Sequence, residues 1–125
     1  MKGTRKNRIC VEKICFYCDE IAKILDNHGH SKEYFFNSVE MQYACSMCIV
    51  QIGEMISLLE DEFIGSHPEI PWRQIKGARN IYVHGYGELD LDEVWNTLTE
   101  SVPVLKNQIS ELLAKFEEKQ DNNNE

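Results

Sequence analysis

Apolar residues recur along most of the chain at intervals of three and four. This is the spacing of an α-helix that buries one face. In the first such segment the apolar positions are Ile9, Ile14, Tyr17, Ile21, Ile24 and Leu25. The same pattern predicts helices over residues 5–27, 32–36, 37–63, 71 to about 84, and 90 to about 119. No segment shows the alternation of a β-strand, so we expect an all-α protein.

Turn and capping residues separate these segments. Gly29 suits the left-handed position that ends a helix, and Ser31 can cap the short helix that follows. Pro71 suits the first position of a helix, where its missing N–H costs nothing. Asp90 is the predicted cap of the last segment, in which Pro103 should kink the helix or break it in two.

Gly53 lies inside the longest predicted helix, where glycine costs about 1 kcal/mol relative to alanine. We therefore expect another helix to approach closely at this point. Short connections between five amphipathic segments predict an antiparallel bundle of four or five helices. The domain should span residues 1–119, followed by a polar tail over residues 120–125.

Composition excludes several classes of protein. The chain of 125 residues has a net charge of −8, which argues against coating nucleic acid regardless of sequence. Its longest apolar runs are too short to span a membrane. Its basic first residues are not followed by the apolar core of a signal peptide, so we expect a cytoplasmic protein.

Five cysteines form two CxxC pairs and one single residue: Cys10, Cys15, Cys18, Cys45 and Cys48. Both pairs lie within predicted helices and lack the turn residues of a zinc knuckle. We therefore favour core packing over a structural metal, and expect no metal site. No glycine-rich phosphate loop, metal triad or nucleophilic-serine motif is present, so no cofactor is expected.

Arg73, Lys76 and Arg79 recur at steps of three and would form one basic stripe on a helix. Most of the acidic residues lie elsewhere. The stripe is either an ordinary solvated helix face or a local binding surface for RNA phosphates.

The stripe leads into the segment with the most chemistry, residues 79–86. It contains Arg79, Asn80, His84 and Tyr86. Histidine can accept and donate protons near neutral pH, and arginine presents planar donors that match phosphate oxygens. Together they suit RNA cleavage without a metal ion. In a continuous helix the two side chains would diverge by about 140°, so a helix end or a second subunit must bring them together. Arg-x4-His alone is a weak pattern, since His84 could simply cap a helix C-terminus.

These residues resemble the Rx4HxY signature of the HepT-like branch of the HEPN superfamily. Four further segments are similar to that branch: residues 51–54, 70–75, 83–86 and 90–95. The resemblance is close from Gln51 to Leu98 and covers the whole chain in length and helix order.

The resemblance implies a homodimeric helical bundle that is the toxin of a type VII toxin–antitoxin pair. It implies a metal-independent endoribonuclease acting on tRNA or mRNA, with Arg79 and His84 as the catalytic pair in a dimer cleft and Asn80 as a polar helper. The product would carry a 2′,3′-cyclic phosphate. A minimal nucleotidyltransferase antitoxin would transfer AMP to Tyr86.

Two other functions stay open. The chain could be a non-catalytic nucleotide- or substrate-binding subunit of a nucleotidyltransferase complex, or a purely structural helical dimer. The intact Arg79, His84 and Tyr86 favour the ribonuclease.

Overall fold

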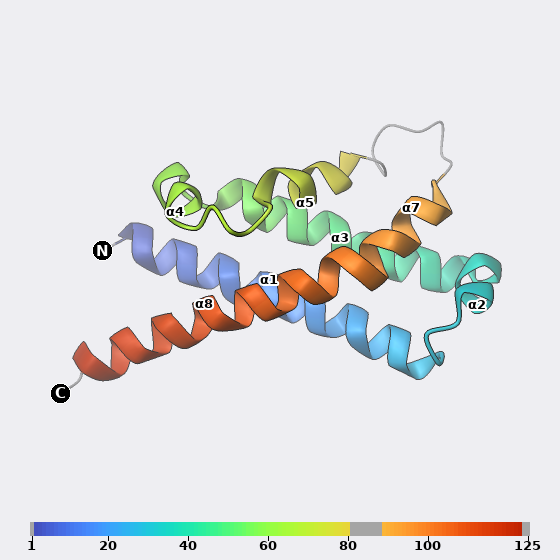
Figure 1. Ribbon diagram of the computed structural model, residues 1–125, viewed down its shortest axis with the longest axis horizontal. Helices are drawn as coiled ribbons and strands as arrows, with labels where there is room; N and C mark the ends of the chain where they lie inside the picture. Colours follow the sequence, from blue (N-terminus) through green and yellow to red (C-terminus); the bar gives the residue numbers. More distant parts are fainter. Residues whose placement is uncertain (1, 81–88, 124–125) are drawn as a thin grey trace.

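The structure, a computed structural model, describes residues 2–80 and 89–123 (Figure 1). Its elements, in chain order, are α1 (Lys2–Asn27), α2 (Lys32–Asn37), α3 (Val39–Leu58), α4 (Asp61–Ser66), α5 (Trp72–Ala78), α7 (Leu91–Asn96), the π-helical turn η1 (Thr97–Ser101) and α8 (Val102–Asn123). Every regular element in these ranges is helical, which confirms the predicted all-α class.

The main helical segments, which are α1, α3, α5 and the rod of α7, η1 and α8, alternate in direction. In Figure 1, α1 and α3 run side by side in opposite directions, and α5 lies against α3. The continuous rod of α7, η1 and α8 returns across α1. The two described ends of the chain lie at the same end of the bundle. None of the described helices is both long and apolar enough to cross a membrane.

The core lies where α1, α3 and the last rod meet. Its largest fully buried side chains are Phe35, Ile14, Ile21, Ile49, Ile52, Ile56, Leu98, Leu105 and Ile109. Three cysteines, Cys10, Cys18 and Cys45, are buried among them, as predicted. Burial raises the pKa of the Cys18 and Cys45 thiols to about 12, so both are neutral core groups near pH 7.

The capping signals at Gly29, Ser31 and Asp90 are confirmed, whereas Pro71, predicted as the first residue of its helix, is the N-cap of α5. Gly29 has a φ of +61°, and His30 after it also lies in the left-handed region at +54°. The Ser31 hydroxyl accepts a hydrogen bond from the Tyr34 N–H at 3.0 Å. The Asp90 carboxylate accepts one from the Glu93 N–H at 3.2 Å.

The predicted bounds of the long helix, residues 37–63, are wrong at both ends. It starts at Val39, because the Ser38 hydroxyl caps it by accepting from the Met41 N–H. It ends at Leu58, and the extended backbone that follows buries Leu59. The buried Asn7 side chain accepts a hydrogen bond from the Glu60 N–H at 3.1 Å. A tertiary contact with α1 therefore decides where α3 stops.

The last predicted helix is not broken at Pro103. Proline has no N–H for the carbonyl four residues earlier. The wider turn η1 just before it absorbs this defect, with the Val102 N–H donating to the Thr97 carbonyl. The rod then continues to Asn123, into the segment predicted as a tail.

Gly53 marks the contact between α3 and the end of α5. A Cβ atom placed on Gly53 would lie 2.9 Å from Cδ of Arg79, 3.1 Å from its Cβ and 3.3 Å from its Cγ. The aliphatic stem of Arg79 thus lies across the bare backbone of α3. The close approach predicted at this glycine is confirmed.

Gly53→Ala is expected to lower the free energy of unfolding by up to about 2 kcal/mol. An alanine gains about 1 kcal/mol of helix propensity, but overpacking costs about 1–3 kcal/mol. Gly65→Ala in α4 is the matched control, since nothing lies within 4 Å of its Cβ position. That variant should be as stable as the parent chain or more so. Urea denaturation measures both, and equal stabilisation by the two substitutions would contradict the close contact.

Candidate functional site

The predicted site residues divide between described and undescribed parts of the chain. Arg73, Lys76, Arg79 and Asn80 are described, and all lie in or directly after α5. The predicted helix end near His84, together with His84 and Tyr86, falls in residues 81–88, outside the described residues.

Arg79 is fixed to α3 at two points. Its stem lies over Gly53, and its Nη1 donates a hydrogen bond to Oε1 of Glu54 at 2.7 Å. This short distance is typical of a charge-assisted bond. Among the described residues this is the one hydrogen bond of the guanidinium, whose other N–H donors could meet a phosphate. We call Gly53 and Glu54 the arginine seat.

The ion pair contributes little to stability. The Arg79 and Glu54 side chains are 24% and 51% exposed, and pairs of this kind contribute about 0.2–1 kcal/mol. Its main physical effect is on geometry. A long, flexible side chain at the end of a short helix is held in one direction by a different helix.

The other predicted site residues in and after α5 face solvent to different degrees. Arg73 and Asn80 are exposed, and Lys76 is half-buried. Within the described chain neither Arg73 nor Lys76 takes part in an ion pair, although seven other ion pairs occur there. Both cations can therefore attract an anion without first breaking a bond to a described residue.

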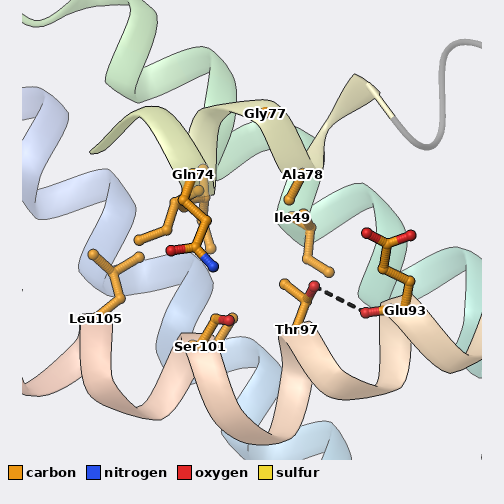
Figure 2. A pocket seen from close by; sticks show the side chains of 11 residues that line it. Ile49, Gln74, Gly77, Ala78, Glu93, Thr97, Ser101 and Leu105 are labelled. Atoms are coloured by element: carbon orange, nitrogen blue, oxygen red, sulfur yellow. Dashed lines mark hydrogen bonds between the residues drawn. The ribbon is translucent and has the colours of Figure 1, made fainter. Parts of the chain in front are cut away.

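A pocket lies between α5 and the rod of α7, η1 and α8 (Figure 2). It has a volume of about 210 Å³. Its apolar lining residues are Ile49, Ile52, Ile75, Val102 and Leu105, and its polar ones are Gln74, Glu93, Thr97 and Ser101. Gly77 and Ala78 complete the wall, so the pocket adjoins Arg79 along the chain.

The part of the chain in residues 2–80 and 89–123 holds no group of three or more His, Cys, Asp or Glu side chains placed to bind a metal ion. The side chains of the candidate site lie in and beside α5. They provide a fixed guanidinium, two further cations and a half-apolar pocket beside them.

Sequence patterns did not identify Glu54 or the pocket as parts of the site. Glu54 is one of many acidic residues, and only the fold places it against Arg79. Its position directly after the interrupting glycine was the available signal. The polar lining of the pocket comes from α5 and from the rod of α7, η1 and α8, and that rod contains a π turn that no sequence pattern indicated.

Comparison with known proteins places this site in context. "Probable ribonuclease HepT" from Thermococcus cleftensis is 32% identical over 80 residues, which cover 64% of this chain and 73% of that protein. A protein of Caldanaerobacter subterraneus subsp. tengcongensis named "Putative RNase" is 31% identical over 87 residues, covering 70% and 78%. Another of that name from Methanocaldococcus jannaschii is 27% identical over 106 residues, covering 85% and 86%.

No solved structure gives a significant match to this one. The family described as Ribonuclease HepT-like matches residues 14–112, which include all the described site residues. The chain therefore belongs to the HepT-like ribonuclease family of the HEPN superfamily.

Proposed function

We propose that this protein is the ribonuclease toxin of a type VII toxin–antitoxin pair, with Arg79 and His84 as its catalytic residues. The supporting observation is the arginine seat, which holds the Arg79 guanidinium in one orientation at 2.7 Å from Glu54. An arginine fixed in this way is preorganised to meet a phosphate. Membership of a ribonuclease family agrees with this chemistry.

The reaction is a transesterification that needs no metal. His84 takes the proton from a ribose 2′-hydroxyl, whose oxygen attacks the adjacent phosphorus. The bond from phosphorus to the 5′-oxygen breaks, and that oxygen receives a proton. The products are a 2′,3′-cyclic phosphate and a 5′-hydroxyl. Arg79 stabilises the charge that builds up on the phosphoryl oxygens, Asn80 donates a further hydrogen bond, and Arg73 and Lys76 attract the RNA backbone.

A homodimer would complete the site. One face of α3 exposes three large apolar side chains at intervals of four: Val39 at 57%, Tyr43 at 66% and Met47 at 57%. The same face leads through Gln51, whose amide contacts the Met47 sulfur at 3.7 Å, to Glu54 and its partner Arg79. A second copy packed on this apolar stripe would lie next to the arginine, and the two subunits could then share one cleft.

Control by an antitoxin is the second part of the proposal. A minimal nucleotidyltransferase would transfer AMP from ATP to the Tyr86 hydroxyl and release pyrophosphate. The added adenylyl group places bulk and negative charge two residues from His84, where the RNA phosphate must bind. Both effects oppose cleavage. The alternative, a non-catalytic binding subunit of a nucleotidyltransferase complex, uses the same surface without the chemistry.

His84→Ala is expected to lower the rate of RNA cleavage by at least about a hundredfold, the contribution of a general base. The purified protein is incubated with total tRNA and with mRNA in EDTA, and fragments with 2′,3′-cyclic phosphate ends are quantified. Intact mass taken on the same sample shows whether the protein already carries AMP.

Light scattering and thermal unfolding control for assembly and folding of the His84→Ala variant. Undiminished cleavage by that variant would reject His84 as the base. Absence of cleavage by unmodified wild-type protein would favour the binding-subunit alternative.

Glu54→Gln is expected to lower kcat about ten- to a hundredfold without raising KM. Loss of the carboxylate releases Arg79 from its orientation, and it also removes a negative charge that opposes RNA binding. Asp19→Asn is the matched control, because its ion pair with Lys106 at 3.1 Å also joins two helices but lies elsewhere. An unchanged kcat in Glu54→Gln, or an equal loss in Asp19→Asn, would mean that the seat does not act on catalysis.

Tyr86→Phe is expected to keep ribonuclease activity and to escape the antitoxin, because phenylalanine has no hydroxyl to modify. Cleavage assays after incubation with the cognate nucleotidyltransferase and ATP measure this, with mass spectrometry to detect the AMP. Complete inhibition of the variant would show that the antitoxin acts by binding or through another residue.

A further inference from the structure

No steric constraint among the described residues requires a glycine at position 77. It lies within α5, and no described contact comes within 4 Å of its Cβ position. It does not have a positive φ, so an alanine would fit its backbone. Glycine is less favourable than alanine in a helix. Gly77 contributes only backbone atoms to the wall of the pocket.

The opposite wall of this pocket is built by a helical defect. Glu93, Thr97, Ser101 and Leu105 all line the pocket at steps of four residues. In an α-helix each such step advances about 40° beyond a full turn, so four residues in this series would drift away from one face. The π turn η1 rotates less per residue and keeps the series aligned. Figure 2 shows all four on the rod that faces α5.

The polar groups of the pocket are free to receive a ligand. The Gln74 side chain is exposed, and Figure 2 shows its amide directed from α5 toward Ser101. Glu93 makes no ion pair within the described ranges, and its carboxylate rises from α7 toward the end of α5. Thr97 donates to the Glu93 carbonyl at 3.0 Å, which leaves its lone pairs available as acceptors.

These groups select the class of ligand. An apolar floor suits a flat ring, and about 210 Å³ is below the size of pockets for drug-sized molecules, so one ring system is the appropriate occupant. The Glu93 carboxylate repels phosphate and accepts hydrogen bonds from N–H groups. Single-stranded RNA is recognised through bases that leave the stack and are hydrogen-bonded along their edges.

We propose that this pocket binds one nucleobase of the RNA substrate, and that Glu93 selects guanine. Guanine carries N1–H and the N2 amino group side by side, so that one carboxylate can accept from both, while Gln74 meets its O6 or N7. Ala78 in the pocket wall directly precedes Arg79, so the pocket and the arginine would belong to one RNA-binding surface around α5. The inference rests on the proposed ribonuclease function and adds its base preference.

The test measures binding of RNA that cannot be cleaved. Fluorescence anisotropy of the full chain is recorded with short 2′-O-methyl uridine oligonucleotides in which one position is guanine, inosine, adenine or cytosine. Inosine keeps N1–H and O6 but lacks the N2 amino group. We expect wild-type protein to bind the guanine oligonucleotide about tenfold more tightly than the inosine one, the discrimination of a bidentate contact.

Three variants assign that difference to the pocket. Glu93→Gln should bring guanine and inosine to within about twofold, since the second acceptor is lost. Gly77→Leu should abolish the preference by filling the pocket, whereas Gly65→Leu, at the other helical glycine with open space around it, should retain it. Circular dichroism confirms folding, and the Glu93→Gln result stands alone if Gly77→Leu does not fold.

The outcomes separate this inference from the function on which it rests. Equal affinity for all four oligonucleotides, or a guanine preference that survives Glu93→Gln, overturns the base pocket and leaves the ribonuclease proposal intact. A wild-type protein that neither binds these oligonucleotides nor cleaves total RNA overturns both.

Discussion

The contact between Arg79 and α3 is the constraint on which the rest of the site depends. Gly53 lets the stem of the arginine lie directly on the helix backbone, and Glu54 in the next position holds the guanidinium. Gly53 thus provides the space for the arginine stem, and Glu54 provides the negative charge that holds the guanidinium. The helix that carries Arg79 is short, so packing against α3 supplies the rigidity that α5 alone would lack.

A protein with a net charge of −8 needs a local group of basic residues to attract an anion. Glu54 offsets part of the positive charge of Arg79. The arginine seat therefore orients the guanidinium but weakens its attraction for an anion. Arg73 and Lys76 lie on the same short helix without ion pairs to described residues and can supply the attraction. Affinity and orientation are therefore divided between neighbouring residues of one stripe.

Both faces of α5 contribute to the architecture of the candidate site. On one side, the stem of Arg79 packs on Gly53, whose lack of a side chain permits this close contact. Another side faces the last helical rod across a pocket, and Gly77 contributes only backbone atoms to its wall. The π turn before Pro103 shapes the far wall of that pocket. Two helical glycines and one helical defect, each unfavourable by itself, thus build the surroundings of the arginine.

The sequence by itself determined the helical class, the caps at Ser31 and Asp90, the left-handed Gly29 and the close approach at Gly53. Each follows from local periodicity or from the steric properties of one residue type. Arg79 and His84 were singled out as a catalytic pair by residue type together with the family resemblance, because their spacing alone is a weak pattern, and this stays a prediction. The end of α3 at Leu58, the partner of Arg79 and the pocket between α5 and the last rod were decided only by the tertiary structure. In each case the decisive group lies on another helix, and periodicity along one segment carries no information about which residues of another segment it will meet.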